Sequence, residues 1–347
     1  MPRLKRVDVS KPGLTRRRNG DRFEYLDAAG NRITDESVVA RVEALVLPPA
    51  WEDVWISPIA SGHIQATGLD VRGRRQYRYH DHWRYLRDRE KHERVLDFAV
   101  ALPAARLRVA EDLADNKLSR RRVLSCAVRL LDLGFFRVGS EQYAEENHTY
   151  GLATIRREHV TVSRGGVITF DYMAKGSKHR RLELTDPAVQ KVVTAMKRRR
   201  GGDEELLAWQ EHGTWVDVKS HDINEHLREV TGGDYSAKDF RTWHATVLAA
   251  VGLAVSLEVA TSETARKRAV TRVVKEVSTY LGNTPAVCRS SYIDPRIIDL
   301  FAAGQTIAPD LFSLGEDAVF GQPATQGAIE GAVLRLLREP VSEALAG

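Results

Sequence analysis

Residues 281–296, with the sequence LGNTPAVCRSSYIDPR, contain a tyrosine, Tyr292, that can act as a nucleophile. A tyrosine phenol has a pKa near 10, so at neutral pH it attacks poorly unless positive charges stabilise its anion. A tyrosine nucleophile therefore needs cationic side chains beside it. Since Tyr292 is one of ten tyrosines in the chain, its surroundings must single it out.

Four upstream residues are candidates for those surroundings. Arg137 follows two phenylalanines in FFRVG, and Lys175 lies in FDYMAKGSK at the expected tip of a β-hairpin. Arg241 lies in KDFRTWH near the start of an expected helix, and Asn283 lies nine residues before Tyr292. Taken singly, each has an ordinary structural explanation: an arginine paired with a carboxylate, a lysine in a solvated turn, or an asparagine that caps a helix.

Together these residue types fit transfer of a phosphoryl group to a tyrosine. Arginine presents paired N–H donors in a fixed geometry that suits phosphate oxygens. A lysine ammonium can protonate the strongly basic alkoxide that leaves. The chain has no GxxxxGK[ST] motif and no evident carboxylate cluster for magnesium, so we expect no cofactor and no metal ion in this chemistry.

The first 80 residues predict a small antiparallel sheet with one helix. Residues 21–35 alternate aromatic and polar side chains around a turn at residues 27–30, which is typical of a hairpin. A short helix that ends at Pro48 should follow. Further strands are expected at residues 53–57, 62–70 and 74–79.

From His82 onward the apolar spacing becomes helical, with a break expected at Pro103. Gly134 should end a helix over residues 119–134. A second hairpin is expected over residues 160–172, with a third strand at 181–184. After Asp186 only helices and polar connections are expected, with the helices at residues 221–231, 238–256, 262–280, 294–302 and 327–337.

These elements predict an α+β fold with a small β-rich N-terminal domain and a larger, mainly α-helical catalytic domain that contains a small antiparallel sheet. The length of 347 residues exceeds that of most single domains. The predicted parts are a flexible basic arm (1–20), a β-rich domain (21–90), a mainly helical domain with the candidate site residues (91–305) and a partly helical tail (306–347).

The charge distribution and the cysteine content indicate which kind of partner the protein binds and in which cellular compartment it lies. Between Arg72 and Arg94 there are nine Arg or Lys against four Asp or Glu, interleaved with aromatic residues. Such a run is typical of a surface that meets phosphates and sugars, although a solvated helix face explains it too. The two cysteines, Cys126 and Cys288, form no CxxC motif, so neither disulfides nor a zinc site are expected. With no signal-like or membrane-spanning apolar run, we expect a cytoplasmic protein.

The ordered set of FFRVG, FDYMAKG, KDFR and LGNTP…SSYIDPR resembles the type IB DNA topoisomerases, in particular their poxvirus-like branch found in bacteria. The resemblance runs from about residue 20 to about residue 305. It includes GHIQATGLDVRGRRQYRYH at residues 62–80, which resembles the segment of that family that contacts DNA. It also includes NHTYGLATIRREHV at residues 147–160.

The resemblance implies relaxation of supercoiled duplex DNA through a transient 3′-phosphotyrosyl intermediate, without ATP or metal. Tyr292 would be the nucleophile, Arg137 and Arg241 would bind the non-bridging oxygens, and Lys175 would protonate the leaving 5′-oxygen. Many relatives have a histidine where this chain has Asn283. An amide can donate a hydrogen bond to a phosphate oxygen but carries no charge.

The resemblance also implies a partner, double-stranded DNA. No obligate protein partner and no membrane are expected, and the protein should act as a monomer associated with the nucleoid. The first domain would close around the duplex. The expected DNA-binding residues are Arg74, Arg75, Gln76, Tyr77, Tyr79 and Lys238, of which the first two would serve phosphates and the next three a groove.

Two alternatives share part of this pattern. Tyrosine recombinases use the same order of Arg, Lys, Arg and Tyr, but their second box normally has the form HxxR where this chain has KDFR at residues 238–241. They also have a helical N-terminal clamp instead of a β-rich one. A non-catalytic DNA-binding protein would explain the basic run and leave the residues around Tyr292 unexplained.

Overall fold

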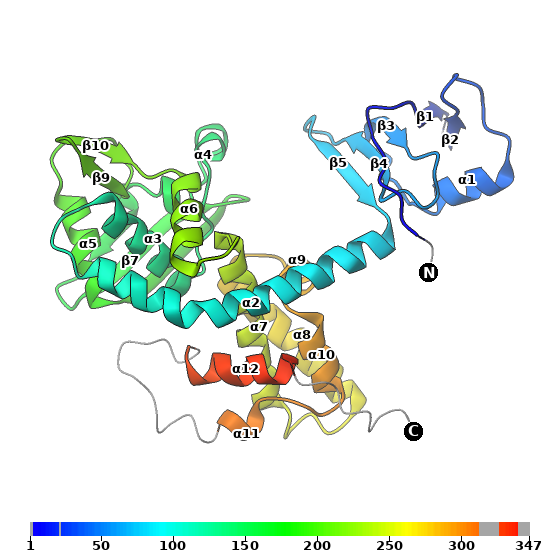
Figure 1. Ribbon diagram of the computed structural model, residues 1–347. Helices are drawn as coiled ribbons and strands as arrows, with labels where there is room; N and C mark the ends of the chain where they lie inside the picture. Colours follow the sequence, from blue (N-terminus) through cyan, green and yellow to red (C-terminus); the bar gives the residue numbers. More distant parts are fainter. Residues whose placement is uncertain (1–2, 21, 312–325, 339–347) are drawn as a thin grey trace. The chain divides into compact units, whose positions relative to one another are not determined.

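The computed structural model describes residues 3–20, 22–311 and 326–338. The chain divides into two compact units, Met1–Glu93 and Arg94–Gly347 (Figure 1). The first is built on strands and the second mainly on helices, so the predicted α+β fold class is confirmed. Among the described residues, no helix combines the length and the apolar character that crossing a membrane requires.

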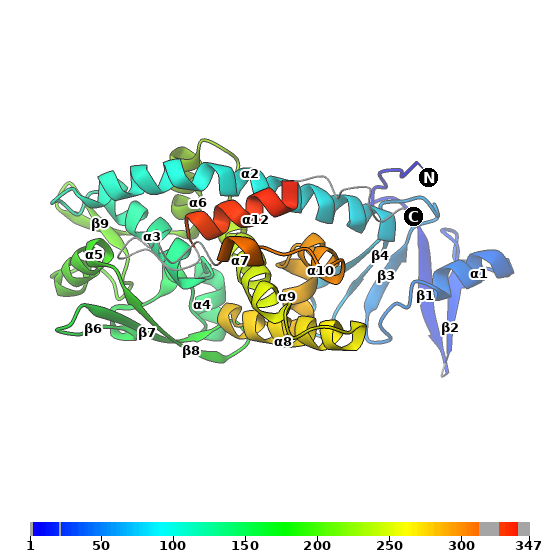
Figure 2. The same cartoon turned by 90° about the horizontal axis from the view of Figure 1, so that it is seen from below.

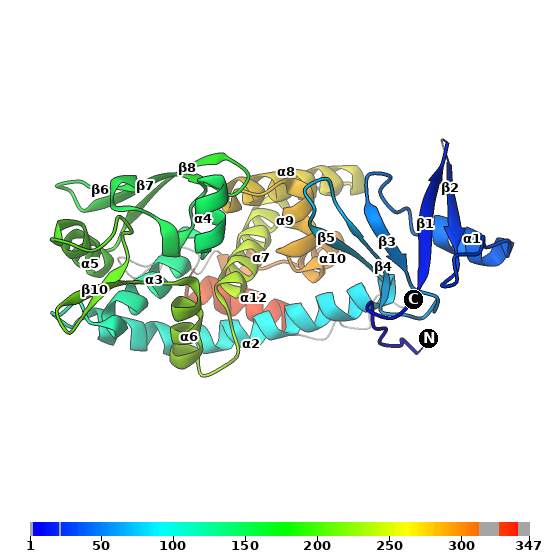
Figure 3. The same ribbon diagram turned by 90° about the horizontal axis from the view of Figure 1, so that it is seen from above.

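The first unit is a five-stranded antiparallel sheet in the order β2-β1-β3-β4-β5. Its strands are β1 (Leu14–Asn19), β2 (Arg22–Leu26), β3 (Glu52–Ile56), β4 (Ile64–Leu69) and β5 (Arg75–Tyr79). Helix α1 (Glu36–Glu43) lies beside the sheet (Figure 3). Its Val42 packs with Val54, Ile56 and Ala66 in a small core.

The prediction that the two halves of residues 21–35 pair with each other as a hairpin was wrong. Strand β2 pairs along its whole length with β1, whereas after the turn only an isolated bridge joins Leu26 to Arg32. Residues 14–19 are therefore part of the sheet and not of a loose arm. The three arginines of β1 hid this strand from the sequence analysis, because charged residues are uncommon in strands. Arg16 is accommodated there by placing its guanidinium carbon 4.1 Å from the centroid of the Phe23 ring.

Helix α2 (Asp81–Leu113) continues through Pro103, so the predicted break there was wrong. A proline inside a helix removes one hydrogen bond and costs about 3 kcal/mol. Here Phe98, Leu102 and Ala105 are buried on the other side of the helix, while Pro103 is exposed. Burial of that apolar face offsets the lost hydrogen bond.

The second unit contains a three-stranded antiparallel sheet in the order β6-β7-β8, a separate two-stranded hairpin, and helices that pack around α7. Figure 2 shows α12 lying alongside α2 and α7. In chain order its elements are α3 (Arg120–Gly134), α4 (Glu141–Asn147), β6 (Val160–Val162), β7 (Val167–Ala174), β8 (Lys178–Thr185), α5 (Pro187–Arg198), β9 (Ala208–Glu211), β10 (Thr214–Asp217), α6 (Ser220–Thr231), α7 (Ala237–Ser256), α8 (Glu263–Leu281), α9 (Pro285–Ser291), α10 (Pro295–Ala302), α11 (Ala308–Leu311) and α12 (Ala328–Arg338).

The hairpin β9–β10 corrects the prediction that only helices follow Asp186. Its two-residue turn consists of His212 and Gly213, with φ values of 47° and 84°. Two consecutive positive φ angles are the signature of the tight hairpin turn whose twist matches that of the flanking strands. With only four residues in each strand, the apolar alternation is too short to stand out in the sequence.

An ionic network in the interior of the second unit joins α12 to α2, α3 and α7. Glu330 of α12 accepts hydrogen bonds from Arg106 of α2 at 2.5 Å and from the indole N–H of Trp243 in α7 at 2.8 Å. Arg106 also donates to Asp132 of α3 at 2.9 Å. Asp132 lies 3.3 Å from His244 of α7. One carboxylate of α12 thus holds α2 and α7 together.

Replacing Glu330 by Ala should lower the free energy of unfolding by about 3–5 kcal/mol, because it removes one of the two carboxylate partners of Arg106, whose side chain is only 17% exposed. Denaturant unfolding of the purified protein measures this loss. Asp97→Ala is the matched control, because the pair of Asp97 with Arg338 also joins α2 to α12 but is exposed, with 69% and 49% of the side chains accessible. It should cost at most about 1 kcal/mol. Equal losses in the two variants would contradict the role given to Glu330.

Candidate active site

A cavity of about 350 Å³ in the second unit brings together Tyr292, Arg137, Lys175 and Arg241. Lys238, which was predicted to bind DNA, lines it as well. None of the residues that line this cavity is an aspartate or a glutamate. Four cations facing one cavity without a carboxylate form a site for an anion.

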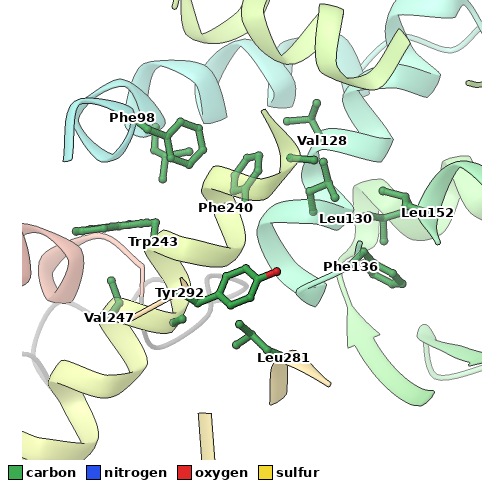
Figure 4. Close-up of a cluster of buried hydrophobic side chains, with 14 of the residues drawn as sticks. Phe98, Val128, Leu130, Phe136, Leu152, Phe240, Trp243, Val247, Leu281 and Tyr292 are labelled. Carbon is green, nitrogen blue, oxygen red and sulfur yellow. The ribbon is translucent and has the colours of Figure 1, made fainter. Parts of the chain in front are cut away.

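Tyr292 lies at the C-terminal end of the short helix α9. Thr284 caps the start of this helix by accepting a hydrogen bond from the backbone N–H of Val287 at 3.3 Å. The Tyr292 side chain lies among buried apolar residues near Leu281 (Figure 4), and the residue is only 8% exposed. At this depth nearby charges act on the phenol with little screening by water.

Arg241 is the charge in closest contact with the phenol. Its guanidinium carbon lies 5.2 Å from the centroid of the Tyr292 ring. The arginine comes from the first turns of α7, where Ser236 and Asp239 form a capping box with a backbone hydrogen bond of 2.8 Å. Lys238 lies three residues before Arg241, so both project from one face of the helix into the cavity.

The buried guanidinium of Arg241 is held by backbone carbonyls. It donates to the carbonyl of Phe135 at 2.5 Å and to that of Leu281 at 2.8 Å. These carbonyls end α3 and α8, where helix dipoles concentrate negative charge. The two helix ends thus stabilise a buried cation that has no carboxylate partner among the described contacts.

Arg137 is positioned by an unusual turn at the end of α3. The prediction that this helix ends at Gly134 is confirmed, and the next residue, Phe135, adopts the left-handed conformation, with φ 54°. Beyond the turn, the backbone N–H of Leu152 donates to the carbonyl of Arg137 at 2.8 Å. There Gly151 lies so close to the chain that an added Cβ would be 2.4 Å from the Cα of Gly139.

Asn283 lies beside Arg137 but does not line the cavity that contains Tyr292. Its side-chain oxygen accepts a short hydrogen bond from the guanidinium of Arg137, which also donates to the carbonyl of Gly282 at 3.4 Å. The amide nitrogen of Asn283 is buried and has no partner among the described residues. Asn283 therefore orients Arg137 and keeps one donor unused.

Lys175 occupies the turn between β7 and β8, as the sequence predicted. Ala174 and Lys178 are the last paired residues of the hairpin, and Gly176 and Ser177 complete the turn with φ values of 78° and 54°. The Lys175 side chain is exposed and reaches the cavity from this tip.

Charge and burial act in opposite directions on the phenol. Burial alone would raise the pKa of Tyr292, but the positive charges of Arg241, Arg137 and Lys238 outweigh it, so the pKa lies below the ordinary value of 10.0. Burial, together with repulsion from Arg137, lowers the pKa of Arg241 to about 10. The site is thus poised to accept negative charge.

The other predicted DNA-binding residues lie at or beside β5, an edge strand of the first unit. Arg74 donates to Asp70 at 2.7 Å, and Arg75 donates to Asp53 at 3.1 Å. Tyr77 stacks on Tyr79 with ring centroids 5.9 Å apart, and 45% of Tyr77 is exposed. Gln76 donates to Asp70 at 2.9 Å. This edge therefore presents aromatic rings flanked by arginines.

A possible cation site lies elsewhere in the described part of the chain. Carboxylate oxygens of Asp203, Glu205 and Asp217 lie within 4.8 Å of one another. Burial and the neighbouring Asp203 raise the pKa of Asp217 to about 6. Arg199, 3.9 Å from Asp217, already supplies positive charge there, and none of the three acids lines the cavity with Tyr292.

The sequence analysis missed Arg180 of β8. It lines the neighbouring cavity together with Arg137 and donates to the carbonyl of Gly134 at 3.0 Å. A signal was present, because Arg180 shares one face of its strand with Leu182 and Leu184. An arginine at an inward-facing position needs a buried partner, and here that partner is a helix end.

Comparison with known proteins agrees with this geometry. The family described as "Eukaryotic DNA topoisomerase I, catalytic core" matches residues 80–299. The "Bacterial DNA topoisomerase IB, N-terminal domain" matches residues 22–70. These matches favour the topoisomerase hypothesis over the recombinase and the non-catalytic alternatives.

Individual relatives give the same result. The DNA topoisomerase 1B of Acanthamoeba polyphaga mimivirus is 29% identical over 296 residues, which cover 83% of this chain and 87% of the viral protein. DNA topoisomerase 1 of Daucus carota is 27% identical over 46% of this chain, and that of Schizosaccharomyces pombe is 29% identical over 38%. The aligned segments span only 19% and 15% of those two proteins. The catalytic-core family matches more than half of the residues of this chain. The chain therefore belongs to the type IB DNA topoisomerases.

Proposed function

We propose that this protein relaxes supercoiled duplex DNA by cleaving and rejoining one strand through a 3′-phosphotyrosyl intermediate, without ATP or a metal ion. The observation that carries this proposal is the position of Tyr292. Its phenol lies beside Arg241 at a cavity that Arg137, Lys175 and Lys238 also line and to which no carboxylate contributes.

In the cleavage step the phenol oxygen of Tyr292 attacks the phosphorus, and the bond from phosphorus to the 5′-oxygen breaks. The phenol proton passes to water, and Lys175 gives a proton to the leaving 5′-oxygen. One phosphoester bond replaces another, so the free 5′-hydroxyl can reverse the step without an energy source. While one strand is held on Tyr292, the duplex can swivel and lose supercoils.

The arginines serve the charge that develops on the phosphate. Arg137 and Arg241 supply N–H donors to the non-bridging oxygens, where preorganised donors lower the barrier most. Asn283 keeps Arg137 in place, and its unused amide nitrogen is available to a phosphate oxygen after a local shift. Its contribution as a donor is thus secondary to its hold on Arg137.

The edge of the first unit supports binding to double-stranded DNA. Arg74 and Arg75 would exchange their carboxylate partners for phosphates, and Gln76, Tyr77 and Tyr79 would contact a groove. Lys238 would bind a phosphate next to the one that is cleaved. The protein would act as a monomer on DNA in the nucleoid.

Replacing Tyr292 by Phe should abolish both the covalent adduct and relaxation, because it removes only the attacking oxygen. Adducts trapped on a labelled duplex and resolved on a denaturing gel measure this, with peptide mapping of the modified residue. Binding of the same duplex should be unchanged within a factor of about 3 and should fall steeply with added salt. Relaxation by the Phe variant would refute the assignment.

The phenol should lose its depressed pKa when a neighbouring cation is removed. In Arg241→Gln, and to a smaller extent in Arg137→Gln, the pKa of Tyr292 should rise, because less positive charge stabilises the phenolate. An ultraviolet titration in which the Tyr292→Phe spectrum is subtracted isolates this phenol. Tyr280 serves as the control, since it is 61% exposed, and a Tyr280→Phe background should leave the result unchanged. An unchanged pKa in both arginine variants would contradict the electrostatic role.

Relaxation should proceed in EDTA and without ATP, on positively and on negatively supercoiled plasmid alike. The protein's own cations supply the charge stabilisation that a metal ion supplies in other phosphoryl transfers. Gel assays of plasmid topoisomers measure this with chelator-treated protein. An absolute requirement for magnesium or ATP would rule out the proposed mechanism.

A further inference from the structure

We propose that Arg180 is a positioning residue that ties the hairpin carrying Lys175 to the helix end that aims Arg137. This inference rests on the proposed function of the same site. Arg180 itself need not touch the phosphate. Its role would be to fix the positions of Lys175, the general acid, and Arg137 relative to each other.

The contacts of Arg180 place it against both helix ends that meet at the site. It donates to the carbonyl of Gly134, the last residue of α3, at 3.0 Å. On its other side, a Cβ added to Gly282, the residue that caps α8, would lie 3.2 Å from a terminal nitrogen of Arg180. A side chain at residue 282 would therefore displace the guanidinium.

Four hydrogen bonds, two at each helix end, follow one pattern. The carbonyls of Gly134 and Phe135 accept hydrogen bonds from Arg180 and Arg241, and those of Leu281 and Gly282 accept from Arg241 and Arg137. Three guanidiniums thus bind the exposed carbonyls at the ends of α3 and α8. Negative helix ends offset the mutual repulsion of the arginines.

The first two of these carbonyls flank the left-handed turn that leads to Arg137. A phenylalanine at φ 54° costs about 1 kcal/mol or more relative to an ordinary helical conformation. The turn is maintained because Arg180 and Arg241 each hold one of its carbonyls. Loosening either contact would release the backbone two or three residues before the Arg137 side chain.

Arg180 also belongs to the strand that follows Lys175. It is paired across the hairpin with Tyr172, whose ring stacks on Phe136 with centroids 6.3 Å apart. The paired register then continues for only two residues to the turn with Lys175. Arg180 is thus a polar anchor close to the hairpin tip, and its other contact is the chain segment that carries Arg137.

The consequence for catalysis is geometric. A displacement of about 1 Å at a catalytic group can cost on the order of 100-fold in rate. If Arg180 sets the position of Lys175, its loss should slow the departure of the 5′-oxygen more than any other part of the step. If it acted on the phosphate charge instead, its loss would slow cleavage whatever the leaving group.

A change of leaving group separates these two cases. Single-turnover cleavage is measured at saturating enzyme on a duplex that contains the site at which the wild-type adduct maps. A second duplex has sulfur in place of the leaving 5′-oxygen. A thiol has a pKa near 8.5, so the sulfur leaves as a thiolate with little need of a proton.

Arg180→Gln should slow cleavage of the oxygen substrate by about 10- to 100-fold. On the sulfur substrate the slowing should be clearly smaller, because only the displacement of Arg137 then matters, and Lys175→Ala should cleave that substrate within a factor of about 3 of the wild type. Arg180→Lys retains one donor for the carbonyl of Gly134 and should lie between wild type and Arg180→Gln. Equal slowing on both substrates, or no slowing on either, would overturn the proposal.

Two control variants exclude trivial explanations. Arg181→Gln changes the neighbouring residue of the same strand, which faces solvent and pairs with Glu183 at 3.0 Å. Arg199→Gln removes another buried guanidinium that donates to backbone carbonyls, among them that of Leu206 at 2.7 Å, away from the cavity. Both should cleave the oxygen substrate at nearly the wild-type rate. If Arg180→Gln does not fold, Arg180→Lys alone decides by the same comparison of substrates.

Failure of the proposed function would look different. A wild-type protein that forms no covalent adduct on either duplex would refute the function itself. A wild-type protein that forms the adduct, together with Arg180 variants that cleave both substrates like it, would refute only the role of Arg180.

Discussion

The structure around the cavity depends on how buried arginines are stabilised without carboxylates. A carboxylate in the cavity would neutralise the charge that we propose serves a phosphate, yet an unpaired buried cation is costly. The chain resolves this conflict with backbone carbonyls at the ends of α3 and α8, which accept hydrogen bonds from Arg137, Arg180 and Arg241. Partial negative charges hold the guanidiniums in place but leave their net charge available.

This arrangement explains why Tyr292 is buried. Burial opposes ionisation of the phenol, but it also removes the water that would screen Arg241. The charges of the surrounding cations prevail, so the pKa is lowered despite the loss of solvent. The short helix α9 is enough to place the phenol beside Arg241. It begins only a few residues after Leu281, whose carbonyl accepts a hydrogen bond from Arg241.

The opposite side of α7 is held by a network of a different kind. There Glu330 binds Arg106 and Trp243, so a carboxylate does pair with a cation, and none of the three residues lines the cavity with Tyr292. Helix α12, which carries Glu330, lies beyond residues 80–299 that match the family's catalytic core. A segment outside the common core thus supports the helix that presents Arg241.

Residue types and local patterns determined much of this protein from the sequence alone. The order of Arg137, Lys175, Arg241 and Tyr292 indicated phosphoryl transfer to tyrosine, and alternating residues with a glycine-containing turn predicted the hairpin that presents Lys175. The fold class and most helices followed from periodicity and capping residues, which are local properties.

What only the tertiary structure decided involves partners distant in the chain. The pairing of β1 with β2 and β3, the continuity of α2 through Pro103 and the contact of Asn283 with Arg137 all depend on which segments meet. The link between Arg180 and the chain segment that carries Arg137 became visible only when the carbonyl partner of Arg180 on α3 was known. Local sequence specifies which groups can do chemistry, whereas long-range packing decides which of them share a buried environment, because burial and charge are properties of the assembled neighbourhood.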